Sequence, residues 1–145
     1  MTGVLAVAAA LAAATVVGLL WRRRNGVLRA HGGSGDDEVD DVLTPDDLGA
    51  RLGEKATLVQ FSSAFCAPCR ATRRVLGDVA GMVDGVAHID IDAESNLDLV
   101  RRLNVVRTPT VLVLDDTGRI VRRATGTPRK PDVIAALGEA VRRVD

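Results

Sequence analysis

The first stretch of the chain is uniformly apolar, and short apolar runs alternate with polar segments along the rest. Residues 3–21 form a run of nineteen residues (21 − 3 + 1) without a charge. As a helix this run is about 28 Å long, close to the roughly 30 Å of a bilayer core. Trp21 and three arginines at positions 22–24 follow the apolar run as an interfacial boundary would. The pattern predicts a single transmembrane anchor with a basic flank, residues 1–24.

A cleaved signal peptide is the alternative, and it would carry positive charge before its apolar run. Met1 and Thr2 are uncharged and the arginines come afterwards, which favours a retained anchor. Because Lys and Arg favour the cytoplasmic side, the arginines at 22–24 predict a cell-membrane protein whose soluble domain lies in the cytoplasm. An extracytoplasmic domain is the alternative location.

Residues 25–42 combine Gly and Ser with an acidic run, which predicts a flexible acidic linker. A solvated, self-repelling tether is expected in place of a metal cluster, because nothing holds the carboxylates in a common geometry. His31 is expected to be solvated as well. The acidic residues concerned are Asp36, Asp37, Glu38, Asp40 and Asp41.

The remaining residues, 43–145, show the pattern of an α/β domain. Thr44-Pro45-Asp46-Asp47 predicts a capped helix start, with Leu48 and Leu52 inward and a stop at Gly53. Strands are expected at 56–62, 86–91, 110–116 and 119–125, and helices at 70–82, after Ser95 and at 131–144. The last helix is expected to turn Ile134, Leu137 and Val141 inward. This order implies a mixed sheet with helices on both faces.

Composition narrows the function classes. The formal net charge is zero, so no basic field indicates a nucleic-acid partner. Aromatic residues make up 2% of the chain, so the core has to be built from aliphatic side chains. Two cysteines cannot form the disulfide framework of a small secreted scaffold.

Both cysteines, Cys66 and Cys69, fall where a predicted strand ends and a predicted helix begins. The unpaired amides of a helix N-terminus would stabilise a Cys66 thiolate, which is the attacking form. Cys69, one turn further, is close enough to resolve a mixed disulfide. Pro68 is tolerated in a first helical turn, where its missing N–H would have no partner.

Two other interpretations of the pair are weaker. A structural zinc site needs four nitrogen or sulfur ligands, and the chain has no second CxxC or nearby His pair, so no metal is expected. His88 lies mid-strand and is expected to pack or to reach the surface. Two inert buried cysteines would leave their position at a helix start unexplained, so a redox pair is favoured.

The segments FCAPC and RTPTVLVLDDTGRIV, with Gly126 before the last helix, resemble the thioredoxin superfamily over Val39 to Val144. The resemblance implies a thioredoxin fold with Cys66 as nucleophile and Cys69 as resolving cysteine. It also implies a cis bond between Thr108 and Pro109, with the Thr108 backbone pairing with the substrate. Phe65, Ala67 and Pro68 are the further substrate-positioning residues, and 39–43 would be the first strand.

The chain departs from the family pattern near the pair. Phe65 stands where thioredoxins carry Trp, and Ala67 replaces the glycine of CGPC. Gln60 takes the place of a buried carboxylate and cannot titrate, and Arg74 takes that of a helix-kinking proline. These changes indicate a narrower partner range or an unusual proton route through water.

We therefore expect a membrane-tethered thiol–disulfide oxidoreductase that reduces protein disulfides. It needs no metal or organic cofactor beyond the Cys66–Cys69 dithiol. Its electrons would come from an upstream reductase or a low-molecular-weight thiol. The alternative is a non-catalytic adaptor of the same fold, which binds a protein at the membrane and uses the cysteines as a redox-sensitive contact.

Overall fold

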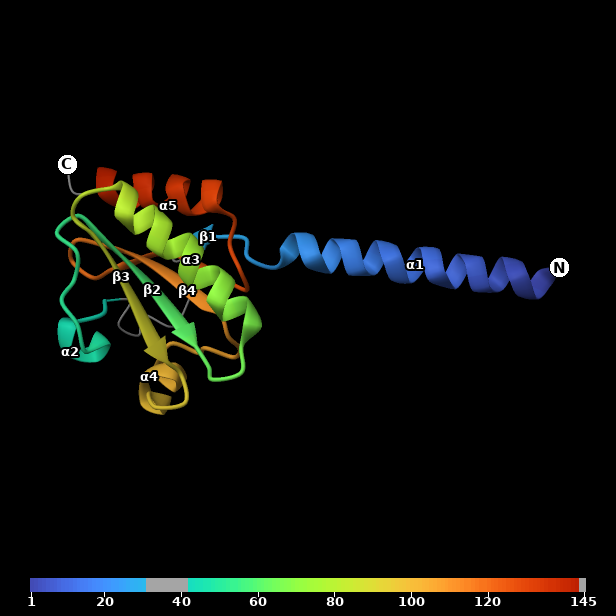
Figure 1. Cartoon of the computed structure of the whole chain (residues 1–145), viewed down its shortest axis with the longest axis horizontal. Helices are drawn as coiled ribbons and strands as arrows, with labels where there is room; N and C mark the ends of the chain where they lie inside the picture. The colour runs from blue at the N-terminus through green and yellow to red at the C-terminus, as the bar shows by residue number, and fades with distance from the viewer. Residues whose placement is uncertain (31–41, 144–145) are drawn as a thin grey trace, which may run out of the picture.

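A five-stranded mixed sheet is the centre of the computed structural model, which describes residues 1–30 and 42–143 (Figure 1). Its strands are β1 (Arg29–Ala30), β2 (Ala56–Ser62), β3 (Val86–Asp92), β4 (Thr110–Asp115) and β5 (Ile120–Thr125). The helices are α1 (Thr2–Arg24), α2 (Pro45–Leu48), α3 (Ala67–Met82), α4 (Leu97–Arg102) and α5 (Lys130–Arg142). The spatial order is β1-β5-β4-β2-β3, with β2 and β3 parallel and the other neighbours antiparallel.

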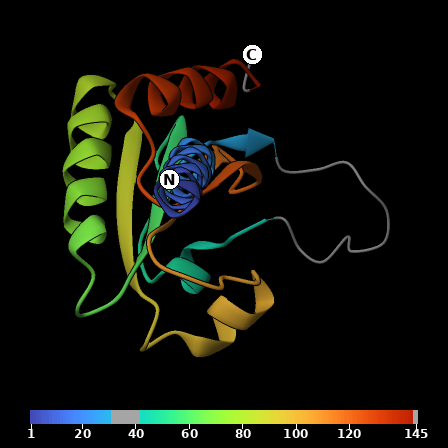
Figure 2. The same ribbon diagram turned by 90° about the vertical axis from the view of Figure 1, so that its right-hand side faces the viewer.

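Helices lie on both faces of this sheet, as the sequence predicts. Helices α3 and α5 cover one face, and α2 and α4 lie against the other (Figure 2). Each face has its own aliphatic core because alternate residues of a strand point to opposite sides. On the first face Leu58, Val111 and Val113 pack with Leu76, Val79, Val133 and Leu137; on the second Val59, Phe61, Leu112 and Leu114 pack with Leu48, Leu99 and Leu103.

Strand β2 is the most enclosed element. It pairs with β3 on one side and β4 on the other, and all seven of its residues are buried. The predicted strand at 56–62 is thus confirmed at both ends. Since a central strand is held on both edges and both faces, it provides a rigid base for the residues that follow its C-terminal end.

Two helices differ from the predicted pattern. Helix α2 ends at Leu48 because Gly49 adopts a left-handed conformation with φ of 64°, so Leu52 packs against the core from a loop. In α5 the buried face consists of Val133, Ala136, Leu137 and Ala140, and Ile134 is 43% exposed. The prediction for α5 was wrong at Ile134 because it assigned the inward face from the large apolar side chains. In the structure the small side chains of Ala136 and Ala140 are buried instead and let this helix approach the sheet.

The start of α2 has the predicted capping arrangement. The Asp47 amide donates to the Thr44 hydroxyl over 3.2 Å, and the Thr44 amide donates to the Asp47 carboxylate over 2.8 Å. The hydrogen bond from Arg102, together with that from the Thr44 amide, lowers the pKa of Asp47 to about 2. This cap ties the start of α2 to the end of α4.

Helix α1 extends away from the sheet, and by length and composition it could cross a membrane (Figure 1). The apolar window of this helix has a mean hydropathy of 2.4 and none of it is buried. Of the expected linker, residues 25–30 lie against the domain, where Arg29 and Ala30 pair with Arg123 and Arg122 of β5. Residues 31–41, with His31 and the acidic run, lie outside the described residues.

The expected first strand at 39–43 is only partly within the described residues. Val42 forms an isolated antiparallel bridge with Arg119, and the Leu43 amide donates to the Gly118 carbonyl over 2.8 Å. The first strand of the observed sheet is instead β1, at the β5 edge. This short pairing has no counterpart among the predicted elements.

Candidate functional site

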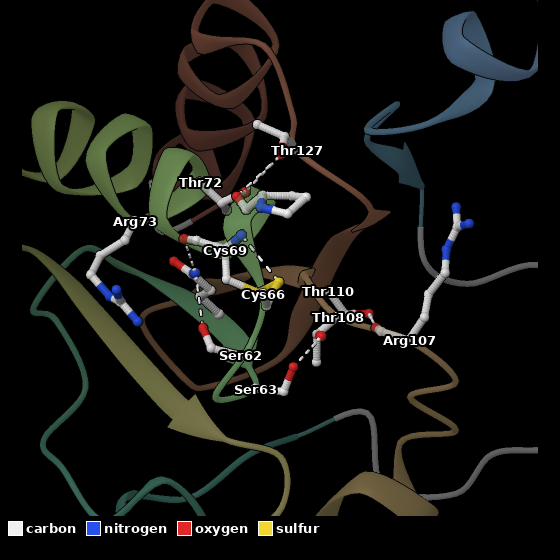
Figure 3. Close-up of a disulfide and its surroundings, with 12 residues drawn as sticks. Ser62, Ser63, Cys66, Cys69, Thr72, Arg73, Arg107, Thr108, Thr110 and Thr127 are labelled. Carbon is white, nitrogen blue, oxygen red and sulfur yellow. Dashed lines mark hydrogen bonds between the residues drawn. A yellow bond between two sulfur atoms is a disulfide. The ribbon is translucent and has the colours of Figure 1, made fainter.

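The two cysteines lie at the junction of β2 and α3, as predicted (Figure 3). Cys66 is the N-cap of α3, and the Cys69 amide donates to the Cys66 sulfur over 3.1 Å. The two residues form a disulfide with their Cα atoms 5.2 Å apart. Cys66 is partly exposed, whereas Cys69 is 1% exposed. Solvent and a partner protein therefore reach the Cys66 sulfur first.

The loop before β4 is the second component of the site. The Thr108–Pro109 bond is cis, as the family resemblance implied. The hydroxyls of Ser63 and Thr108 share a hydrogen bond of 2.9 Å, which joins the loop before the cysteines to the loop before Pro109. Thr110 donates to the Arg107 carbonyl over 2.7 Å. In Figure 3 the Cys66 sulfur is directed toward the side on which Thr108 and Thr110 lie.

Two threonines that the sequence analysis did not single out hold the first turn of α3 at Pro68. Thr72 and Thr127 both donate to the Pro68 carbonyl, over 3.0 and 3.3 Å, and their hydroxyls are 3.1 Å apart. Thr72 is fully buried in α3, and Thr127 follows β5. A threonine on a helix one turn after the pair was the available signal for Thr72, but nothing local indicates Thr127.

A buried polar network lies behind Cys69. Gln60 is fully buried, and its side-chain nitrogen donates to the Cys69 carbonyl over 2.8 Å and to the Ser62 hydroxyl over 3.0 Å. Its oxygen faces His88, 3.3 Å from Nε2. Burial lowers the pKa of His88, assisted by the charge of Arg73 and opposed by that of Asp90. Gln60 therefore holds the first turn of α3 through hydrogen bonds, without a titratable group.

Two of the three arginines of α3 lie near the cysteine pair, in different surroundings. Arg73 donates to Asp90 over 2.7 Å, and Ser62 donates to the other oxygen of that carboxylate over 2.6 Å. The charge of Arg73 is thus balanced at β3. Arg70 is exposed beside the disulfide.

Exposed apolar residues flank Cys66 along the chain. Phe65 is 103% exposed, and Ala67 and Pro68 are exposed as well. Thr108 is partly exposed and Pro109 is buried beneath it. The structure thus brings all seven predicted site residues to one end of the sheet. Within residues 1–30 and 42–143 no group of three or more His, Cys, Asp or Glu side chains is arranged to hold a metal.

Comparison with known proteins agrees with this arrangement. The profile of the Thioredoxin family matches residues 42–139. A thioredoxin of Mycolicibacterium smegmatis is 33% identical over 71% of this chain and 91% of its own length. One from Mycobacterium tuberculosis is 28% identical over 60% of this chain and 75% of its own length.

Solved structures show the same fold. A mutant thioredoxin from Halobacterium salinarum superposes with a TM-score of 0.56 at 24% identity, covering 74% of this chain and 87% of that one. Chloroplastic thioredoxin z gives a TM-score of 0.54 at 24% identity, over 60% of this chain and 79% of that one.

A cysteine pair at a helix start, beside a cis-proline on a mixed sheet, is the arrangement of a thiol–disulfide oxidoreductase. With the match over residues 42–139, the chain belongs to the thioredoxin family, and Cys66 and Cys69 are its active-site pair. Membership favours the enzyme over the adaptor interpretation. It also implies protein disulfides as substrates and a reductase as the source of electrons.

Proposed function

We propose that this protein is a membrane-tethered reductase of protein disulfides in which Cys66 is the nucleophile and Cys69 the resolving cysteine. The observation that carries the assignment is the difference in exposure of the two sulfurs. Cys66 is accessible at the start of α3, whereas Cys69 is 1% exposed and held one turn further in. Only the first can meet a sulfur on another protein without a rearrangement of the helix.

The reaction begins when the Cys66 thiolate attacks one sulfur of the partner disulfide. A mixed disulfide forms and the partner's other sulfur leaves as a thiolate. The Cys69 thiolate then attacks the Cys66 sulfur, which forms the Cys66–Cys69 disulfide and releases the second partner thiol. Two electrons and two protons pass from the dithiol to the partner disulfide. An upstream dithiol reductase or a low-molecular-weight thiol restores the dithiol.

The first helical turn favours the attacking form of Cys66. The Cys69 amide already donates to that sulfur over 3.1 Å, and a helix N-terminus carries about half a positive charge. Gln60 cannot accept the proton that Cys69 must lose, because an amide does not titrate. Water that enters with the partner is the acceptor in our proposal.

The partner would bind over the apolar rim and the cis-proline loop. Phe65, Ala67 and Pro68 offer exposed contacts around the sulfur, and the Thr108 backbone would pair with an extended segment of the partner. The Ser63–Thr108 hydrogen bond supports this role because it fixes the loop relative to the cysteines.

Trapping tests the assignment of the two cysteines. We expect Cys69→Ser to accumulate mixed disulfides with partner proteins, since the second step is blocked, and Cys66→Ser to accumulate none. Non-reducing gels of the two variants, followed by reduction, measure this. Equal trapping by both variants would contradict the proposed roles. Insulin reduction with dithiothreitol as electron donor measures turnover of the wild-type chain.

For the rest of the chain we propose an anchor at 1–24, a connecting segment at 25–42 of which residues 25–30 lie against the domain, and a catalytic domain at 43–145 in the cytoplasm. The uncharged run at residues 3–21 and the three arginines in the last turn of α1 support this arrangement. An alkaline phosphatase fusion to the C-terminus should be inactive, because that enzyme folds only outside the cytoplasm; an active fusion would place the domain outside. A mature N-terminus beyond residue 24 would show that the helix is a cleaved signal sequence.

A further inference from the structure

A groove beside the active site has one wall from outside the family-matching region. Its first wall contains Pro68, Thr108, Pro109 and Thr127. Its second wall is the end of α1 and the segment that follows it, with Leu19, Arg22, Arg23, Asn25, Gly26 and Val27. The family match begins at residue 42, so this second wall lies outside the matched region. Figure 1 shows α1 leaving the domain on the side at which α3 begins.

Specific contacts hold the second wall in place. The Gly26 amide donates to the Thr125 carbonyl over 2.7 Å, and Gly26 has a φ of 78°. A Cβ at position 26 would lie 2.0 Å from the Thr127 carbonyl oxygen, so only glycine permits this approach. Strand β1 continues the contact along β5. The segment is therefore seated on the domain against the end of β5 and Thr127.

Arg107, next to the cis-proline loop, links the two walls. Its guanidinium donates to the Asn25 side chain over 2.6 Å and lies 5.7 Å from the centre of the Trp21 ring. Neither of these two contacts is with a carboxylate. The residue that precedes Thr108 thus connects the active site to the end of α1.

The groove has an excess of positive charge. Four arginines line it, Arg22, Arg23, Arg107 and Arg129, with one carboxylate, Asp132. Arg129 pairs with Asp132 over 2.9 Å. Within the described residues no carboxylate pairs with the other three arginines. Three arginines with no carboxylate partner among the described residues favour an anionic occupant of the groove.

We propose that this groove binds an acidic, extended segment next to the target disulfide of a partner protein, and that Arg22 and Arg23 select for it. The inference rests on the proposed reductase function and adds its substrate class. A polypeptide is favoured over a lipid headgroup because the groove runs on to Pro68 and Thr108, beside the reacting sulfur. Charge complementarity across such an interface raises the association rate at low salt.

The test uses the full chain in neutral detergent and three cyclic disulfide peptides that differ only in flanking Glu, Gln or Lys residues. We expect kcat/KM to be about tenfold higher for the Glu peptide than for the Lys peptide at low salt, and the ratio to approach one at high salt. Arg22→Gln combined with Arg23→Gln should lower the low-salt ratio toward one. Because the same protein sample is used for both peptides, the ratio of the two kcat/KM values does not change if part of the variant is inactive.

The matched control is Arg51→Gln with Arg142→Gln. It removes the same charge from exposed positions that do not line the groove, and should keep the wild-type ratio. Equal kcat/KM for the three peptides, or a preference unchanged in the Arg22/Arg23 variant, overturns the inference. The inference is also overturned if the preference for the Glu peptide is lost in phosphatidylglycerol nanodiscs but kept in phosphatidylcholine nanodiscs. That result would show that anionic lipid, and not the peptide, occupies the arginines. No insulin reduction by the wild type would instead overturn the proposed function.

Discussion

The side-chain nitrogen of Gln60 lies 2.8 Å from the carbonyl oxygen of Cys69, to which it donates a hydrogen bond. This contact joins the central strand to the first turn of the active-site helix. The same amide group reaches Ser62 and His88, so one buried side chain connects β2, β3 and α3. A neutral amide performs this task without changing charge when the cysteines change redox state.

Gln60→Glu should therefore destabilise the domain at neutral pH. The carboxylate cannot donate to Ser62 or to Cys69, and its charge would be buried, at a cost of about 2–3 kcal/mol. Denaturant unfolding at pH 8 and pH 5 measures the effect, which should shrink at pH 5 as the carboxyl group protonates. Arg51→Gln, an exposed control, should change the free energy of unfolding by less than about 0.5 kcal/mol. Equal denaturant midpoints of unfolding at pH 8 for Gln60→Glu and Arg51→Gln would contradict the prediction.

Alkylation should distinguish the two sulfurs of the reduced protein. Cys66 is partly exposed and Cys69 is 1% exposed, so a brief iodoacetamide pulse at neutral pH should label mainly Cys66. Peptide mapping by mass spectrometry gives the ratio of the two labels. In urea the two cysteines should react alike, which serves as the control. Preferential labelling of Cys69 in the folded protein would reverse the assigned roles.

His88 should make the stability of the domain depend on pH. Burial lowers the pKa of His88 in the folded state, so the unfolded chain binds this proton more readily. The free energy of unfolding should therefore fall, relative to His88→Gln, as pH decreases through about 6.5, the ordinary pKa of histidine. Paired denaturant titrations at pH 7.5 and 5.5 measure the difference. A wild type that gains stability relative to the variant at pH 5.5 would refute the stated direction.

Gly26→Ala should release the segment between α1 and the domain. The new Cβ would collide with the Thr127 carbonyl, and a left-handed φ costs about 1 kcal/mol or more for a residue with a side chain. Hydrogen exchange of the amides of residues 26–30 should accelerate, and the fluorescence of Trp21, the chain's single tryptophan, should change.

The control is Gly138→Ala within α5, where a Cβ has no atom within 4 Å. It should stabilise the helix by about 0.5–1 kcal/mol and leave the exchange of residues 26–30 unchanged. Similar exchange rates for residues 26–30 in the Gly26→Ala variant and the wild type would show that the contact at Gly26 does not hold the segment.

The sequence alone determined the elements of the domain other than β1, and the nature of the cysteine pair. The apolar run of β2 indicated a buried strand because every residue of a central strand is enclosed, and the helical pattern after the cysteines placed them at a helix start. Such patterns show which residues of a single segment are buried. The cis bond at Pro109 followed only from the family resemblance.

Only the tertiary structure decided which distant residues meet. Thr127 reaches the carbonyl of Pro68, and His88 reaches Gln60, through packing that no local pattern encodes. The two-residue strand β1 is too short to have a periodicity. It pairs with the edge of β5 just after Gly26, a glycine that allows two backbones to touch. Periodicity reports how a segment faces the core, whereas contacts between segments depend on how the whole chain packs.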